Sequence, residues 1–530
     1  MSKKYVLKEL ARYEINTFAD TIYRNSILYP HAEAFAHQDR RWTFQQFNER
    51  VNQLANGLRS LGLEKGDVIG VLSWNCLEYA EIFGAAMKGG FIAAPLNTRL
   101  TASELTYLLE YSKAKVLFVG QNLKEVLDQA GPLPPTLKQC VSFEDEIEGM
   151  TSYEDLLSKG SKEEPGVSIQ PDDPLVMIFT SGTTGYPKGA LYTHRRKLRD
   201  AQRFFMALQL DVSRKNVLVV PLFHVAGMSF LFSFFYAGAM TVMMRKINFD
   251  PLSIMETIQD ERATEIHIVP TQLVPMLDAP DIKQYDLSSL KRIWYAASPM
   301  PTELLKRGIE QFGPIFSQAY GLSESGPLTT YLNTHDHNLA ERTPEELKAL
   351  ASCGQPWVGV QVRIVDDHGN DVERGEVGEI IVKSDSVMIE YWDRPEETGN
   401  TIQEGWVYTG DLGYYDDRAY IYIVSRKKDM IISGGENVYP IEVEEVLYKH
   451  PAVEEAAVIG IPDPYWVEKV HALIVLRKNA KATEEEIKEY CKQNIASYKA
   501  PKSIEFVDSL PKSPQGKVLK KKLREKYENG

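Results

Sequence analysis

Cysteine is scarce in this sequence, and positive charge is outnumbered by negative charge. Four cysteines occur in 530 residues (Cys76, Cys140, Cys353 and Cys491), and their wide separation excludes a closely spaced metal-ligand motif. The same scarcity excludes a disulfide framework and favours the reducing cytoplasm. The formal net charge of −13 argues against a general nucleic-acid binder, because such a protein needs a basic surface. We therefore expect a cytoplasmic protein that binds no nucleic acid.

Long apolar runs are also missing, with one exception at residues 217–244. The sequence starts Met-Ser-Lys-Lys-Tyr-Val, without an apolar core, so we expect no secretion signal. Residues 217–244 carry no formal charge apart from that of His224, and their length would permit a membrane span. Pro221, Gly227 and Gly238 interrupt the run, however. We predict a buried strand, helix and strand rather than a transmembrane segment. Loose association with a membrane surface stays open.

The length and the order of patterns predict two domains. A chain of 530 residues is too long for one hydrophobic core. Over the first 320 residues, strand-like and helix-like runs alternate, which predicts an α/β fold of mainly parallel layered sheets. After about residue 350, strand-like runs joined by tight turns predict a small antiparallel β region. We place the large N-terminal domain at 1–425, a charged junction at 426–429 and a small α+β domain at 430–530.

Residues 178–189 are the most informative stretch of the chain. They read Ile-Phe-Thr-Ser-Gly-Thr-Thr-Gly-Tyr-Pro-Lys-Gly and follow a predicted buried strand at 175–180. Glycines let backbone N–H groups converge on an anion, hydroxyls donate further hydrogen bonds, and a lysine supplies charge. No Gly-Lys-Ser/Thr tripeptide closes the loop, so it is not a Walker loop. The predicted polyphosphate ligands are Thr180, Ser181, Gly182, Thr183, Thr184, Gly185 and Lys188.

This loop resembles the phosphate loop of the adenylate-forming superfamily, which includes acyl-CoA synthetases, adenylation domains of peptide synthetases, and luciferases. The resemblance spans the chain, because further family motifs follow in order. It implies an AMP-forming acid–CoA ligase that uses ATP, Mg²⁺ and coenzyme A. It also implies that the small C-terminal domain is mobile.

Gln-Ala-Tyr-Gly-Leu-Ser-Glu at 318–324 resembles the superfamily's aromatic-Gly-x-Thr-Glu motif. Tyr320 offers a flat face for a purine, Ser323 a hydroxyl for a phosphate, and Glu324 a carboxylate oxygen for Mg²⁺. The motif follows a predicted strand, and open α/β sheets bind ligands at the carboxyl ends of their strands. The resemblance adds Thr180 at the metal, and Ser298, Gln318, Ala319 and Gly321 at the nucleotide.

Tyr-Thr-Gly-Asp at 408–411 resembles the ribose-binding motif of the superfamily, and Asp411 can accept hydrogen bonds from both ribose hydroxyls. Arg426 resembles the arginine that contacts ribose or phosphate. Lys428 aligns with the hinge position, which makes 426–429 the predicted hinge, although a solvated surface charge would look the same in isolation.

Pro-Lys-Ser-Pro-Gln-Gly-Lys at 511–517 resembles the motif that ends in the catalytic lysine. In adenylation a carboxylate must approach the α-phosphate of ATP, so two anions meet. Lys517 would stabilise the charge that develops there. The predicted catalytic residues are Lys517, Thr180, His224 and Glu324.

Two further motifs belong to the second half-reaction by resemblance. Ser-Gly-Gly-Glu-Asn-Val-Tyr-Pro at 433–440 resembles the loop that enters the site for thioester formation, and Gly434 and Gly435 would let a pantetheine arm pass. Pro-Leu-Phe-His at 221–224 resembles the motif that borders the thiol channel, which adds His224.

The resemblance also directs attention to the walls of an acyl pocket. No arginine, lysine or aspartate stands there to pair with a charged tail, so we predict a medium- or long-chain fatty acid. An aryl acid, a carrier-protein thiol as acceptor, a luciferase-like oxygenase and a non-enzymatic nucleotide-binding protein are the alternatives. A homodimer stays open. The predicted pocket residues are Val225, Met228, Phe230, Tyr295, Ala296 and Ala297.

Overall fold

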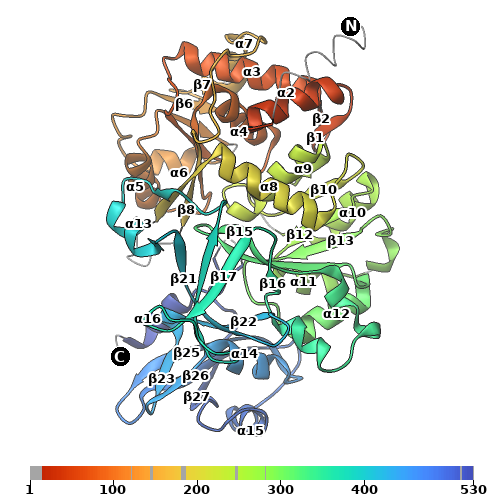
Figure 1. Cartoon of the computed structure of the whole chain (residues 1–530), viewed down its shortest axis with the longest axis vertical. Helices are drawn as coiled ribbons and strands as arrows, with labels where there is room; N and C mark the ends of the chain where they lie inside the picture. The colour runs from red at the N-terminus through yellow and green to blue at the C-terminus, as the bar shows by residue number, and fades with distance from the viewer. Residues whose placement is uncertain are drawn as a thin grey trace.

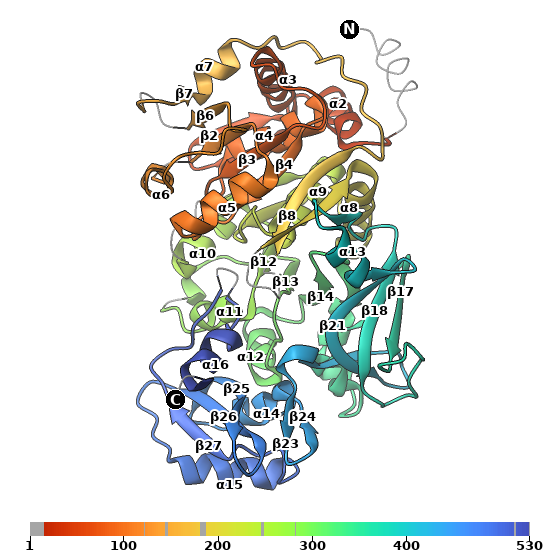
Figure 2. The ribbon, with the colours of Figure 1, turned by 90° about the vertical axis from the view of Figure 1, so that its left-hand side faces the viewer.

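The structure is a computed structural model, which describes residues 15–120, 122–143, 147–180, 187–244, 249–280, 282–513 and 516–528. Four β-sheets make up the frame of the described chain. Two large sheets are layered with helices, a smaller antiparallel sheet lies beside them, and the fourth sheet belongs to the C-terminal part (Figures 1 and 2). The mixed α/β architecture predicted from the sequence is confirmed.

The eight-stranded sheet is mainly parallel and carries the predicted phosphate loop. Its strand order is β19-β9-β8-β4-β3-β5-β6-β7. Among its described strands, only β9 is reversed: it pairs antiparallel with β8 on one side and with β19 on the other. The strands are β3 (Val68–Leu72), β4 (Ile92–Leu96), β5 (Val116–Val119), β6 (Gln139–Ser142), β7 (Thr151–Ser152), β8 (Pro174–Thr180), β9 (Lys188–Thr193) and β19 (Glu390–Tyr391).

The nine-stranded sheet has a parallel centre and antiparallel margins. Its order is β16-β15-β14-β13-β12-β10-β11-β1-β2, in which β1, β11, β10, β12, β13 and β14 pair in parallel. The strands are β1 (Glu33–His37), β2 (Arg40–Thr43), β10 (Lys215–Leu218), β11 (Met240–Met243), β12 (Glu265–Ile268), β13 (Arg292–Tyr295), β14 (Phe316–Leu322), β15 (Gly326–Leu332) and β16 (Gln355–Pro356).

Two smaller sheets follow along the chain. The first is antiparallel and contains β17 (Val360–Val365), β18 (Gly378–Ser384), β20 (Ile402–Gln403), β21 (Trp406–Tyr415) and β22 (Ile421–Arg426). The second contains β23 (Ile431–Ser433), β24 (Glu436–Val438), β25 (Val453–Asp463), β26 (Val467–Leu476) and β27 (Ser503–Phe506). The single 3-10 turn η5 (Lys427–Asp429) joins them. The turn coincides with the predicted junction.

Helices fill the space between and outside the two large sheets. Side chains of α2, α3, α4, α8 and α9 share one core with both sheets, whereas α10, α11 and α12 cover the other face of the nine-stranded sheet. The helices are α2 (Phe18–Leu28), α3 (Phe44–Ser60), α4 (Leu77–Gly89), α5 (Ala102–Ser112), α6 (Lys124–Gln129), α7 (Tyr153–Ser158), α8 (His194–Leu208), α9 (Val225–Ala237), α10 (Pro251–Glu261), α11 (Pro270–Leu277), α12 (Thr302–Phe312), α13 (Pro395–Thr401), α14 (Pro440–Tyr448), α15 (Glu484–Asn494) and α16 (Lys520–Glu528).

The apolar run at 217–244 forms part of this core. It contains the end of β10, the loop through His224, helix α9 and strand β11, as its punctuation predicts. Most of α9 is buried between the two large sheets. Among the described residues, no helix combines the length and the apolar character that a bilayer crossing requires.

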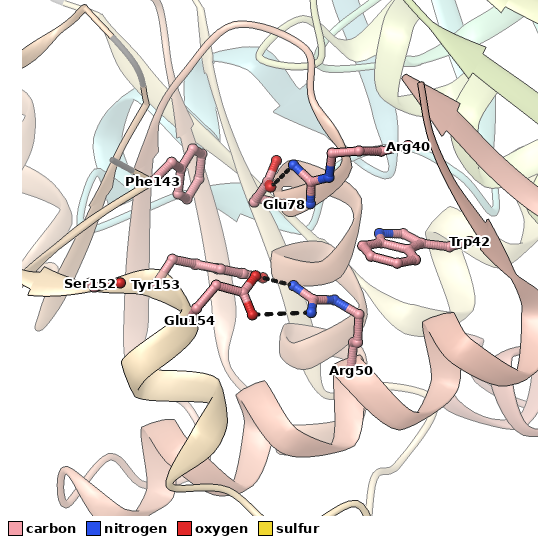
Figure 3. A pocket seen from close by; sticks show the side chains of 8 residues that line it. All are labelled: Arg40, Trp42, Arg50, Glu78, Phe143, Ser152, Tyr153 and Glu154. Carbon is pink, nitrogen blue, oxygen red and sulfur yellow. Dashed lines mark hydrogen bonds and ion pairs between the residues drawn. The ribbon is translucent and has the colours of Figure 1, made fainter. Parts of the chain in front are cut away.

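A cavity of about 390 Å³ lies in the N-terminal part of the fold, away from the strands that carry the motifs (Figure 3). Its two arginines are already neutralised. Arg40 pairs with Glu78 at 2.5 Å, and Arg50 pairs with Glu154 at 2.6 Å. Arg50 also pairs at 2.7 Å with Glu81, whose side chain is fully buried. The charges that line the cavity therefore balance one another, and the ion pairs of Arg50 link α3, α4 and α7. Its lining is Arg40, Trp42, Arg50, Glu78, Phe143, Ser152, Tyr153 and Glu154.

Candidate active site

The predicted ribose motif contains a buried ion pair held between adjacent strands. Asp411 on β21 faces Arg426 on β22 in the antiparallel register, and Arg426 Nε lies 2.6 Å from Asp411 Oδ1. The hydroxyl of Tyr320, at the end of β14, donates to Asp411 Oδ2 at 2.7 Å. Burial raises the pKa of Tyr320, so the phenol stays a donor. Burial opposes the charge on Arg426, but Asp411 raises its pKa above the ordinary value. The three predicted residues are thus brought together with a fixed carboxylate.

Lys188 is a buried cation at the start of β9. The residue is 9% exposed, and no carboxylate pairs with it in the described part of the chain. Its ammonium lies over the ring of Tyr391, 5.0 Å from the ring centroid. A buried cation without an anionic partner is costly, so this position favours an anionic ligand. The predicted loop residues Ser181, Gly182, Thr183, Thr184 and Gly185 lie outside the described residues.

Glu324 lies in the turn between β14 and β15, and its carboxylate is held in place. Tyr391 Oη donates to Glu324 Oε1 at 2.8 Å, and the backbone N–H of Met388 donates to the Glu324 carbonyl at 2.9 Å. The main chain around the motif is tightly packed: a Cβ on Gly321 would lie 2.3 Å from the carbonyl oxygen of Gly326. A glycine is therefore required where the two strands approach each other.

The remaining nucleotide candidates lie at or just beyond the carboxyl ends of neighbouring strands. Gln318 and Ala319 are buried on β14, and Ser323 follows in the turn, where its carbonyl accepts from Tyr192 Oη. Ser298 follows β13 and is partly exposed. Ala297 adopts a φ of 75°, a left-handed conformation that costs energy for a residue with a side chain. This predicted pocket residue therefore sits on a strained backbone.

Lys517 belongs to the C-terminal part and lies near the Asp411–Arg426 pair. The preceding Gly516 lies against α11, because a Cβ there would come within 2.3 Å of Thr271 Oγ1. Partial removal from water and the charge of Arg426 lower the pKa of Lys517 to about 8, and Asp411 and Asp429 oppose this shift. Lys517 itself is exposed, so solvent also reaches its side chain. No carboxylate pairs directly with the Lys517 ammonium among the residues that the structure describes.

The junction separates two sets of ion pairs. Lys427 pairs at 2.8 Å with Asp367, in the turn between β17 and β18, and at 3.2 Å with Glu379 on β18. Asp429, two residues later, pairs at 2.7 Å with Arg524 on α16. Lys428 between them is exposed. The chain is thus fastened to one domain just before Lys428 and to the other just after it.

The glycine loop predicted for the second half-reaction lies in solvent. Gly434 and Gly435 are exposed between β23 and β24, with φ values of 61° and 85°. Gly434 N donates to the Trp466 carbonyl at 2.8 Å, a contact within the C-terminal domain. In this structure Lys517 is therefore near Asp411 and Arg426, whereas the glycine loop contacts its own domain through Trp466.

His224 caps helix α9 at the edge of the predicted acyl site. Its Nδ1 accepts a hydrogen bond from Ala226 N at 3.3 Å, which assigns the proton to Nε2. Burial lowers the pKa of His224 to about 4, so the ring is neutral at pH 7. A Cβ on Gly227 would lie 2.3 Å from the Pro221 carbonyl oxygen, so the turn that positions this histidine needs a glycine.

The predicted acyl residues do not all face one pocket. Val225, Met228 and Phe230 of α9 belong to the core between the two large sheets. Tyr295 belongs to the core on the opposite face, where its hydroxyl is 3.0 Å from His337 Nε2. Successive side chains of a strand point to opposite faces, and Trp294 takes the α9 side. We therefore correct the prediction for Tyr295; Ala296 packs against the α9 side, whereas Ala297 is exposed at the turn.

Two residues near the site have no signal in the sequence. Tyr391 lies in an unremarkable segment, Glu-Tyr-Trp-Asp-Arg-Pro, yet contacts both Lys188 and Glu324. His267 on β12 is 1% exposed, and its ring centroid is 4.7 Å from that of Phe230. Neither ring nitrogen of His267 has a hydrogen-bond partner among the described residues. Alternation along a short strand predicts burial but not what the side chain meets there.

Comparison with known proteins identifies the family. The model of the AMP-binding enzyme family matches residues 24–392, and that of the AMP-binding enzyme C-terminal domain matches residues 442–517. The chain is 36% identical over 497 residues to the long-chain-fatty-acid–CoA ligase FadD13 of Mycobacterium tuberculosis, which covers 92% of this chain and 94% of that protein. It is 32% identical to the fatty acid–[acyl-carrier-protein] ligase ScoC of Streptomyces coeruleorubidus, with 94% of each chain covered.

A solved structure shares the fold over nearly the whole length. The anthranilate CoA ligase AuaEII, in complex with anthranoyl-AMP, superimposes with a TM-score of 0.89 at 29% identity, and 98% of each chain is covered. Both family models match in the order of the chain, and relatives above 30% identity cover almost all of it. This protein therefore belongs to the AMP-binding enzyme family and is an AMP-forming acyl-CoA synthetase of the adenylate-forming superfamily.

Proposed function

We propose that this acyl-CoA synthetase activates a medium- or long-chain fatty acid in the cleft between Glu324, Asp411 and Lys517. The observation that carries the proposal is the pair of cations, Lys188 and Lys517, which lack a carboxylate partner among the described residues. ATP and an acid supply the missing negative charge. The apolar side chains of Val225 and Met228 support an uncharged acyl tail.

In the first step, a carboxylate oxygen of the acid attacks the α-phosphorus of ATP. The bond from that phosphorus to the bridging oxygen breaks, and the products are acyl-AMP and pyrophosphate. Lys517 stabilises the charge on the pentacoordinate phosphorus and on the incoming oxygen. Lys188, with the loop that precedes it, binds the phosphates, while Asp411 accepts hydrogen bonds from the ribose hydroxyls. Tyr320 and Arg426 hold that carboxylate in place.

The residues present suit a magnesium ion that arrives with the nucleotide. Glu324 and Thr180 offer hard oxygen donors, and Mg²⁺ commonly takes one or two carboxylates and completes its shell with phosphates and water. No group of three or more His, Cys, Asp or Glu side chains in the described segments forms a complete metal site. When bound, the ion would neutralise phosphate charge; Glu324 Oε2 is the atom left to hold it, because Oε1 accepts from Tyr391.

In the second step, the thiolate of coenzyme A attacks the acyl carbon, and the bond to the AMP oxygen breaks. We propose that the small domain turns about Lys428, which withdraws Lys517 and brings Gly434 and Gly435 to His224. The division of ion pairs between Lys427 and Asp429 supports this hinge. The domain limits at 425 and 430, a homodimer and a cytoplasmic location stay predictions from the sequence.

A second candidate substrate is an aryl acid with a hydrogen-bonding substituent. His267 supports this class. Its buried imidazole lies beside Phe230, and neither ring nitrogen has a hydrogen-bond partner among the described residues. A polar atom of the ligand would recover the free energy that these missing hydrogen bonds cost. The likeness to the anthranilate CoA ligase supports the same class. A carrier-protein thiol as acceptor, as the name of ScoC indicates for that protein, is the other alternative.

The role of Lys517 can be tested by assaying the two half-reactions separately. In Lys517→Ala, we expect acid-dependent pyrophosphate release to fall by about 100-fold or more, because a preorganised charge at the transition state is lost. Conversion of supplied acyl-AMP and coenzyme A to thioester should change little. The assay uses acetate, octanoate, palmitate, benzoate and cinnamate, with and without coenzyme A. Lys512→Ala is the matched control, because Lys512 is in the same motif but pairs with Glu455. Undiminished adenylation in Lys517→Ala would contradict the assignment.

The lowered pKa of Lys517 predicts that the rate of adenylation falls at a lower pH than it would with an ordinary lysine. Lys517 acts as a cation, so kcat/KM for ATP in pyrophosphate release should fall as the pH rises through about 8, rather than near the ordinary lysine value of 10.5. Lys517→Arg should be slower but should keep its rate across this range, because a guanidinium stays protonated. A wild-type profile that stays level up to pH 10 would show that Lys517 is not the titrating group.

Replacing His267 tests whether it faces the acyl tail. In His267→Phe, the ratio of kcat/KM for unsubstituted acids to that for their hydroxylated counterparts should rise by about tenfold, since no polar group is left for the hydroxyl. His194→Phe is the control, because the buried ring of His194 also lacks partners in the described chain but lies on α8. The ranking of acids by the wild type distinguishes the two candidates. An unchanged ratio would remove His267 from the pocket.

A further inference from the structure

Tyr391 touches two side chains to which the proposed function gives a role at the phosphates. Its hydroxyl donates to Glu324 Oε1 at 2.8 Å, and the Lys188 ammonium lies 5.0 Å from its ring centroid. A phenol carries its proton at neutral pH, so the Tyr391 hydroxyl is the donor and the Glu324 carboxylate is the acceptor.

The strand that carries Tyr391 explains how these contacts arise. The two-residue strand β19 pairs with β9, the strand that starts at Lys188, and Tyr391 lies opposite Ala190 in the register. Tyr391 itself is 6% exposed. Its side chain therefore lies beside the first residue of β9 and reaches the β14–β15 turn, where Glu324 is. Segments separated by more than 60 residues meet at a single phenol group.

We propose that Tyr391 is a positioning residue for the metal and triphosphate end of the nucleotide site. The proposal rests on the roles given above to Thr180, Lys188 and Glu324. The hydroxyl fixes one oxygen of Glu324 and leaves the other free for the metal. The ring supports the Lys188 ammonium by a cation–π contact without neutralising its charge, so the lysine keeps its attraction for phosphate.

A purely structural role would not need this hydroxyl. The backbone around Tyr391 is already held by other bonds: Tyr391 N donates to Thr398 Oγ1 at 2.9 Å, and Trp392 N donates to the Gly189 carbonyl at 2.7 Å. The side chain of Tyr111 binds the same segment through the Trp392 carbonyl. The hydroxyl of Tyr391 adds a bond to a carboxylate that the proposed chemistry uses.

Tyr391→Phe removes the hydroxyl and keeps the ring. We expect the Mg²⁺ concentration for half-maximal pyrophosphate release to rise by about tenfold or more, because partners of metal ligands affect metal affinity by about 10- to 100-fold. The KM for the acid should stay the same. Tyr391→Leu also removes the ring beneath Lys188, so it should raise the KM for ATP several-fold beyond the value in Tyr391→Phe.

Tyr111→Phe is the matched control. It deletes a phenol that binds the same segment and lies away from Glu324, so it should leave the Mg²⁺ titration unchanged even where it lowers the melting temperature. All titrations are made at a temperature at which circular dichroism shows each variant to be folded. An unshifted Mg²⁺ titration in Tyr391→Phe, or an equal shift in Tyr111→Phe, would overturn the proposal. A wild-type protein that releases no pyrophosphate with any acid would contradict the proposed function instead.

Discussion

Unpaired positive charge is the constraint on which the site depends. Lys188 and Lys517 have no carboxylate partner among the described residues, in a protein whose net charge is −13. Most other cations near the site are paired, as Arg426 is with Asp411. Leaving a buried cation such as Lys188 without a partner costs stability unless a ligand brings the opposite charge. An enzyme that joins a carboxylate to a polyphosphate has this need, because its substrates repel each other.

The architecture positions these cations from distant parts of the chain. Lys188 starts a strand of the eight-stranded sheet and lies over Tyr391, which contacts Glu324. Lys517 comes from the C-terminal domain, lies near Arg426 and Asp411, and follows Gly516, which contacts α11. The small domain lies next to α11 and α12 and forms the lower end of the molecule in this view (Figure 2). One charge is therefore fixed in the large domain, and the other is carried on a part attached through a single 3-10 turn. Such an attachment suits a reaction in two steps.

Patterns formed by residues close together in the sequence made much of the fold predictable. The pairs Thr43 with Gln46 and Thr101 with Glu104 both form the capping boxes that their spacing predicts. The strand before the phosphate loop was placed correctly, since it is apolar and ends at glycines. Each of these features depends on residues a few positions apart. The motifs at 318–324 and 408–411 were also informative, because they lie on β14 and β21, which bring Tyr320 into contact with Asp411.

Contacts between distant segments could not be predicted in the same way. Nothing around Tyr391 indicates that it meets Glu324, because β19 has only two residues and its pairing with β9 spans about 200 positions. Tyr295 was assigned to the wrong face, since a one-residue shift on a strand exchanges the two sides of a sheet. His267 looked like an ordinary core position, and its missing partners become visible only in three dimensions.

The most direct test of the account follows a single oxygen atom. An acid labelled with ¹⁸O in its carboxylate is incubated with ATP, Mg²⁺, coenzyme A and the enzyme, and the AMP is analysed by mass spectrometry. Attack of the carboxylate on the α-phosphorus, followed by thiolysis, leaves one labelled oxygen in AMP, and this is the predicted result. AMP without the label, or a labelled inorganic phosphate formed with ADP, would contradict the acyl-adenylate and with it the roles assigned to the site.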